Sequence, residues 1–126
     1  GLGDVYKRQM VYIRKETKKF GRKKKIEGLL KKNQNVILVE DLITDGGSKV
    51  DFIKSLRDKK SKILCMFVIF NYGIFNKMFN LSGLRTKLLY LTSWREVLIV
   101  AKKKKILTSS NYNKVKSFLK DFGVKN

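Results

Sequence analysis

The stretch VILVEDLITDGGSKVDF, from Val36 to Phe52, decides the fold of this chain. An apolar run of strand length leads directly into two acids, Glu40 and Asp41. A turn follows, and after Ser48 the apolar residues recur with the period of a helix. Acids at the end of a strand are costly to bury unless something binds them. A Gly-Gly-Ser turn at the start of a helix is suited to hold an anion. The stretch therefore predicts a strand–turn–helix unit that binds a ligand with hydroxyls and a phosphate.

The composition limits the chemistry that this unit can perform. The chain has 126 residues, of which 43% are hydrophobic, so we expect a globular domain with a modest core. Cys65 is the one cysteine and there is no histidine, which excludes an intrachain disulfide, a His/Cys metal site and nucleophiles activated by histidine. Catalysis must use carboxylates, lysines, arginines, hydroxyls and backbone amides.

The net charge of +20 predicts a partner with negative charge. Nucleic acid, anionic membranes and phosphorylated substrates all fit. The basic runs at 22–25, 58–62 and 101–105 contain no aromatic residue for base stacking, which disfavours nucleic acid. The longest apolar run, Ile63 to Phe70, is too short to span a bilayer, and the first residues lack a signal-peptide pattern. We therefore expect a cytoplasmic protein that does not bind a membrane.

The rest of the chain alternates between strand and helix patterns. Strands are expected at 10–14, 35–42, 62–70 and 86–93, and helices at 48–57, from Ser93 onward and at 111–122. We interpret 35–42 as a strand buried on both faces, 15–25 as a basic loop and 75–84 as a short helix or irregular segment. This order indicates an α/β fold with a mainly parallel sheet flanked by helices.

In such sheets, ligands bind outside the carboxyl ends of the strands, where Glu40 and Asp41 would lie. Gly46 and Gly47 allow backbone amides to approach a phosphate, and the following helix adds its dipole. Neither a Walker A loop nor a dinucleotide fingerprint is present. From spacing alone, a turn with ordinary capping residues and no ligand stays an open alternative.

These residues resemble a known family. VILVEDLITDGGS is similar to the phosphoribosyl pyrophosphate (PRPP) motif of type I phosphoribosyltransferases. YIRKETKKFGRKKKIEG, from Tyr12 to Gly28, is similar to the flexible loop of orotate phosphoribosyltransferases. FVIFNYGIF and LTSWREVL look like one bacterial branch of that family. The resemblance covers about Met10 to Gly123 and implies a type I phosphoribosyltransferase-like core.

The resemblance implies roles for individual residues. Glu40 and Asp41 would contact the ribose hydroxyls of PRPP, and Thr44 would also lie close to orotate. Arg14, Lys15 and Lys18 would hold the pyrophosphate, and Lys18 and Asp41 are the implied catalytic residues. The implied PRPP site also contains Leu42, Ile43, Thr44, Asp45, Gly46, Gly47 and Ser48, of which the last five would cradle the 5-phosphate.

The reaction implied by the resemblance joins orotate to PRPP and releases pyrophosphate, which forms orotidine 5-phosphate in pyrimidine biosynthesis. Mg²⁺ would be bound mainly through PRPP and not directly by the protein. The flexible loop of the family reaches into the site of the partner subunit, so a homodimer is implied. Cationic side chains would stabilise the charge of the leaving group, and loop closure would exclude water.

Three features depart from the family pattern. Phe20 stands where relatives often carry a loop histidine, and Asp45 adds a carboxylate beside the expected phosphate. Nothing before Met10 resembles the family's N-terminal segment. We therefore expect residues 1–9 to be non-native or disordered, and 10–126 to be the C-terminal part of a phosphoribosyltransferase domain with an uncovered apolar sheet face. As a hypothesis, such a chain binds PRPP weakly and turns over little orotate.

Two alternatives stay open. In the first alternative, the chain is a phosphoribosyltransferase for another base, although the flexible-loop resemblance disfavours this. Otherwise it is a non-catalytic relative that binds RNA or nucleotides as a regulator, which the charge of +20 favours slightly and the retained acids disfavour.

Overall fold

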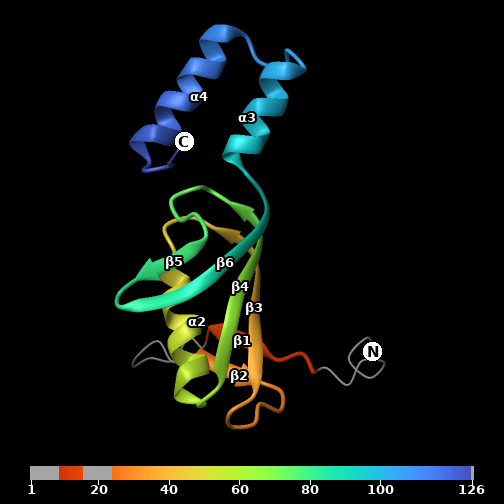
Figure 1. Cartoon of the computed structure of the whole chain (residues 1–126), viewed down its shortest axis with the longest axis vertical. Coiled ribbons are helices and arrows are strands. Elements are labelled where there is room, and N and C mark those ends of the chain that lie inside the picture. Colours follow the sequence, from red (N-terminus) through yellow and green to blue (C-terminus); the bar gives the residue numbers. More distant parts are fainter. Residues whose placement is uncertain (1–8, 16–23, 126) are drawn as a thin grey trace.

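The computed structural model describes residues 9–15 and 24–125. Its main sheet has four strands in the order β3-β4-β6-β5 (Figure 1). The bounds are β3, Asn35–Ile43; β4, Lys62–Asn71; β5, Met78–Leu81; and β6, Leu84–Ser93. β3 pairs with β4, and β4 with β6, in parallel, while β5 pairs antiparallel with β6. The predicted α/β fold with a mainly parallel sheet is confirmed.

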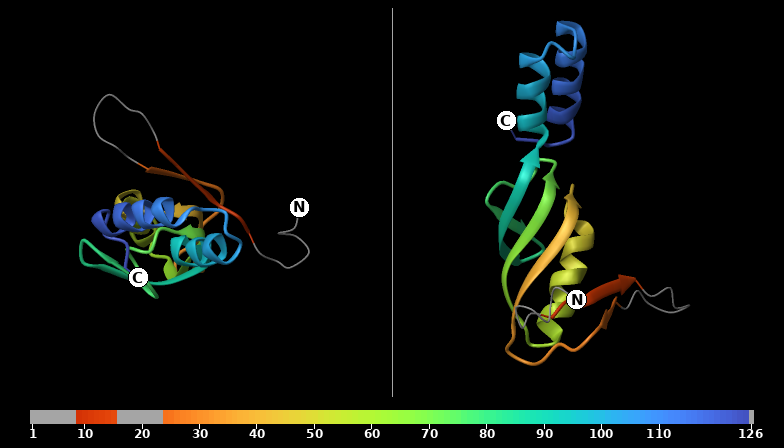
Figure 2. Two further views of the ribbon diagram at one scale, coloured as in Figure 1. Left: turned by 90° about the horizontal axis from the view of Figure 1, so that it is seen from above. Right: turned by 90° about the vertical axis from the view of Figure 1, so that its right-hand side faces the viewer.

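Helix α2 (Gly47–Asp58) covers one face of this sheet and forms the core. Its predicted apolar face is confirmed, because Val50, Phe52, Ile53 and Leu56 are all buried. Burial of each such side chain contributes roughly 1.5–3 kcal/mol to folding. Cys65 is a buried free thiol. Figure 2 shows α2 lying alongside the strands, so its first turn meets the end of β3.

The opposite face of the sheet is apolar and exposed. Ile37 and Val39 on β3 are 53% and 66% exposed, and Ile69, Leu89 and Leu91 on the neighbouring strands are also exposed. The prediction that 35–42 is buried on both faces is therefore wrong, because no element of the described part of the chain covers this side. The expectation of an uncovered apolar face is confirmed.

We expected the segment 75–84 to be a short helix or irregular. It contains strand β5, so this expectation is wrong. Ser82 and Gly83 have φ of 52° and 72°, the left-handed conformations of a two-residue hairpin turn. Leu81 and Leu84 pair directly across this turn. Phe79 on β5 is fully buried, which anchors the hairpin in the core.

The basic segment 15–25 is also only partly a loop. Strand β1 (Tyr12–Lys15) pairs antiparallel with β2 (Lys24–Glu27), so the ends of the segment form a hairpin. Ile13 and Ile26 pack against the core, which explains why a polar segment forms strands. Residues 1–8 and 16–23, which include Lys18 and Phe20, lie outside the described residues. The expectation that residues 1–9 are non-native or disordered therefore stays a prediction.

Helices α3 (Trp94–Lys103) and α4 (Ser109–Asp121) form a hairpin beyond the carboxyl ends of the strands (Figure 1). Ser93 caps α3, and its hydroxyl donates to the Glu96 carboxylate, an arrangement close to a capping box. Gly123, with φ of 91°, follows the end of α4. No helix within the described residues is long and apolar enough to cross a membrane.

Candidate functional site

Two acids lie near the end of strand β3, at the carboxyl edge of the sheet. Glu40 and Asp41 lie in the last four residues of β3, and the chain then turns into α2. Strand β3 ends beside β4, since the backbone N–H of Tyr72 donates to the Ile43 carbonyl at 3.0 Å. The acids, the turn and the start of α2 thus form one continuous unit at the edge where ligands bind in open α/β sheets.

The two acids have different surroundings. Glu40 accepts a hydrogen bond from the Lys49 ammonium at 2.6 Å, and the two side chains are 19% and 9% exposed. Asp41 is exposed to solvent. A partly buried carboxylate is tolerated when an opposite charge and a hydrogen bond accompany it, and Lys49 supplies both. Asp41 is therefore the acid that lies open to a ligand.

The turn depends on glycine at position 46. Gly46 caps α2 with φ of 78°, and an added Cβ would lie 2.5 Å from the Phe79 ring and 3.0 Å from the Phe75 ring. A side chain would meet both the conformational penalty and two packed aromatic rings, of which Phe79 is buried. The backbone N–H groups of Lys49 and Val50 donate to the Gly46 carbonyl and begin the helix.

The first amide of α2 already contacts an acid. The backbone N–H of Gly47 donates to Asp45 Oδ1 at 3.0 Å, and both residues are exposed. The positive end of a helix dipole attracts such a carboxylate. The Asp45 carboxylate therefore lies at the start of α2, beside the turn where a phosphate is expected from the sequence.

The cationic residues of the first hairpin lie elsewhere. Arg14 Nε donates to Glu27 Oε2 at 2.9 Å, and the Arg14 side chain is 70% exposed. In Figure 1, β1 and β2 lie near the end of α2, at the opposite end of the sheet from Thr44–Gly46. Lys15 belongs to β1, and Lys18 lies outside the described residues. Among the described residues, Arg14 forms no ion pair with Glu40 or Asp41.

Sequence reasoning missed two residues at this edge, Lys49 and Asn71. Asn71 is 1% exposed; its Nδ2 donates to the Phe75 carbonyl at 2.6 Å, and its Oδ1 accepts from the Gly73 amide at 2.9 Å. These bonds fix the loop whose Phe75 ring packs beside Gly46. A polar residue at the end of an apolar strand was the available signal for Asn71.

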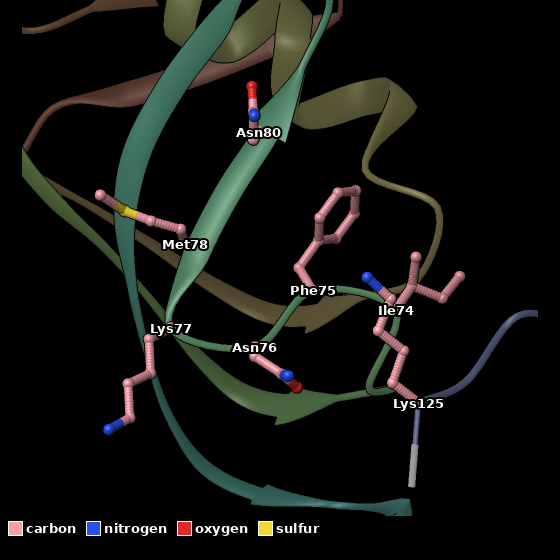
Figure 3. A pocket seen from close by; sticks show the side chains of 7 residues that line it. All are labelled: Ile74, Phe75, Asn76, Lys77, Met78, Asn80 and Lys125. Carbon is pink, nitrogen blue, oxygen red and sulfur yellow. The ribbon is translucent and has the colours of Figure 1, made fainter.

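An open cavity of about 390 Å³ lies on the other side of this loop. Figure 3 shows Asn76 and Lys77 on the loop leading into β5, with Lys125 approaching from the end of the chain. Phe75 lines the cavity, whereas none of the described residues of the turn does. The cavity is therefore a neighbour of the strand–turn–helix unit and not its ligand site.

The described residues contain no cluster of three or more side chains suited to hold a metal ion. Asp41 is the exposed carboxylate beside the turn, and Asp45 contacts Gly47. This donor set fits a divalent cation that arrives with its own phosphate ligands better than a cation held by protein oxygens alone.

The mainly parallel sheet with the strand–turn–helix unit at its edge is a type I phosphoribosyltransferase-like fold. UMP synthase of Leishmania donovani superposes with a TM-score of 0.64 at 26% identity, over 76% of this chain and 21% of that one. No protein-family model matches the chain.

The sequence relatives of the chain are enzymes of one kind, the orotate phosphoribosyltransferases. Orotate phosphoribosyltransferase of Dinoroseobacter shibae is 38% identical over 113 residues, which are 89% of this chain and 50% of that protein. The enzyme of Listeria innocua is 33% identical over 120 residues, 95% of this chain and 57% of that protein. The chain resembles the orotate phosphoribosyltransferases over most of its length, and it spans about half the length of the curated relatives it matches.

Proposed function

We propose that the chain carries the PRPP site of an orotate phosphoribosyltransferase, which joins orotate to PRPP and releases pyrophosphate. The observation that supports this most directly is the unit formed by Glu40, Asp41, the turn at 44–47 and the start of α2. The similarity to orotate phosphoribosyltransferases supports orotate as the base. These relatives lend no support to another base or to a non-catalytic regulator, and only the net charge of +20 slightly favours the regulator.

The turn would bind the 5-phosphate. Thr44, Gly46 and Gly47 offer backbone amides and small side chains, and Ser48 adds a hydroxyl at the first turn of α2. The dipole of α2 attracts the phosphate, and no residue of the first turn of α2 is acidic, although Asp45 lies just before it. Asp45 must give up its bond to the Gly47 amide for this binding to be complete. Leu42 and Ile43 would contribute backbone only, and Thr44 would also approach orotate.

Asp41 would contact the ribose hydroxyls together with Glu40. A carboxylate accepts hydrogen bonds from hydroxyls and stabilises positive charge on the ribose as the bond to pyrophosphate breaks. Because Asp41 is exposed while Glu40 is held by Lys49, Asp41 has the greater freedom to follow the sugar during the reaction. We therefore propose Asp41 as the catalytic carboxylate.

Arg14, Lys15 and Lys18 would hold the pyrophosphate in the site of a partner subunit. Strand β1, which carries Arg14 and Lys15, lies at the far end of the sheet from the turn of its own chain, so a shared site requires a second copy. A homodimer is therefore part of the proposal. Mg²⁺ would enter bound to PRPP and neutralise the pyrophosphate, with Asp41 as the nearest exposed protein carboxylate. The free thiol of Cys65 fits a cytoplasmic location, which we include in the proposal.

Calorimetry with PRPP and Mg²⁺ tests the site, and chromatographic detection of orotidine 5-phosphate tests the reaction. We expect saturable PRPP binding together with slow or undetectable orotate turnover by this chain, because the exposed sheet face indicates an incompletely covered site. Sedimentation with and without PRPP tests the dimer. A folded chain that does not bind PRPP would contradict the proposal.

A further inference from the structure

Lys49 is a buried lysine in the first turn of α2, with 7% of its surface exposed. Placing a lysine there is costly, because its ammonium loses water and its long side chain loses up to about 2 kcal/mol of rotamer entropy. In a chain with so many exposed lysines, this one points inward and contacts an acid of the candidate site. The position therefore calls for a specific function.

The contacts of Lys49 fix both the ammonium and its partner. The ammonium donates to Glu40 Oε2 at 2.6 Å and lies 5.4 Å from the centroid of the Phe52 ring. The ion pair joins the end of β3 to the first turn of α2 and so spans the turn at 44–47. A carboxylate offers about four lone-pair positions. One oxygen of Glu40 is held by Lys49, and the other keeps its capacity to accept.

We propose that Lys49 is a positioning residue that orients Glu40, so that the second carboxylate oxygen accepts a ribose hydroxyl and the site prefers ribose over 2-deoxyribose phosphates. This inference rests on the proposed function. A site built to bind a hydroxyl discriminates against an analogue that lacks it, since the acceptor is then left without a partner. Lys49 also balances the charge of Glu40 beside an anionic ligand, which lowers repulsion of the phosphate.

The experiment compares the affinities for ribose 5-phosphate and 2-deoxyribose 5-phosphate by calorimetry. We expect the native chain to bind the ribose form at least about tenfold more tightly, equivalent to about 1.4 kcal/mol. Lys49→Met should reduce this ratio to near one. Lys54→Met, an exposed lysine of the same helix, should leave the ratio unchanged.

Lys49→Met leaves the Glu40 charge unpaired and can lower folding stability. The double variant Glu40→Gln/Lys49→Met removes both charges, which is often neutral for stability, and it should also lose the preference. A thermal melt of each variant establishes that it is folded. The conservative Lys49→Arg variant should restore part of the ratio.

The outcomes separate the two proposals. If the native chain binds neither sugar phosphate, the proposed function fails and this inference fails with it. If both sugars bind equally to the native chain, the phosphate turn is correct and the role of Glu40 is wrong. If Lys49→Met weakens the binding of both sugar phosphates by the same factor, the affinity ratio is unchanged. Lys49 is then purely structural and the inference is overturned.

Discussion

The Asp45 carboxylate accepts a hydrogen bond from the backbone N–H of Gly47 at 3.0 Å. This contact places a negative charge at the first amide of α2, where the proposed 5-phosphate would bind. Asp45 therefore competes with the phosphate for the same donor and repels it. Two unit charges 4 Å apart interact by about 1 kcal/mol in bulk water and by about 4 kcal/mol near a protein surface.

We predict that Asp45→Ser strengthens binding of inorganic phosphate at least about fivefold, since serine keeps a side-chain acceptor for the Gly47 amide and removes the charge. Isothermal calorimetry at low salt measures the change, and added salt should diminish it. Asp121→Ser makes the same change of net charge at the end of α4 and should have little effect. Weaker phosphate binding by Asp45→Ser would mean that the carboxylate organises the turn instead of obstructing it.

Gly46→Ala should destabilise the chain more than Gly83→Ala does. Both glycines have positive φ, 78° and 72°, so each substitution costs about 1–2 kcal/mol in backbone conformation. At Gly46 the new Cβ also meets the Phe79 ring, which adds about 1–3 kcal/mol, whereas nothing lies within 4 Å at Gly83. Urea unfolding measures both variants. Equal losses would show that the two phenylalanine rings move aside without cost.

Local patterns predicted the elements whose apolar residues face the core. Val50, Ile53 and Leu56 have helical spacing, and Ser93 with Glu96 marks a helix start in the sequence itself. Strand β5 was missed because its four residues are stabilised by the pairing with β6 and by burial of Phe79. Neither of those contacts is visible in a local window.

Predictions for the site were limited in the same way. Spacing located Glu40 and Asp41 at the end of a strand, because a strand followed by a turn and a helix leaves few alternatives. Spacing could not show which of the two acids is partly buried, since this depends on how β3 faces α2. Lys49 looked like one more lysine in a basic chain, and only the direction of its side chain reveals the partner.

Asp41→Asn should weaken PRPP binding in the presence of Mg²⁺ by at least about tenfold, equivalent to about 1.4 kcal/mol. The exposed carboxylate would otherwise accept ribose hydroxyls or face the cation, and an amide does both less well. Calorimetry measures the affinity. Asp58→Asn removes an exposed acid at the far end of α2 and serves as the control. Equal affinity changes in both variants would exclude a specific role for Asp41.

The cap of α3 should make stability depend on pH. The Ser93 hydroxyl donates to the Glu96 carboxylate, which lowers the pKa of Glu96 below its ordinary value of 4.5. A lowered pKa in the folded state adds stability that is present above 4.5 and lost as the pH falls through the folded value. Ser93→Ala should therefore cost about 1 kcal/mol at neutral pH and less in acid.

Urea unfolding across this pH range measures the Ser93→Ala effect against Thr108→Ala. Thr108 caps α4 by accepting from the Asn111 amide, and the first turn of α4 contains no acid. Its loss should cost a similar free energy that does not change between neutral and acid pH. If the cost of Ser93→Ala is equally constant, the Glu96 carboxylate contributes nothing to the cap, and the stabilising effect of the cap comes from the Ser93 bond to the Arg95 amide alone.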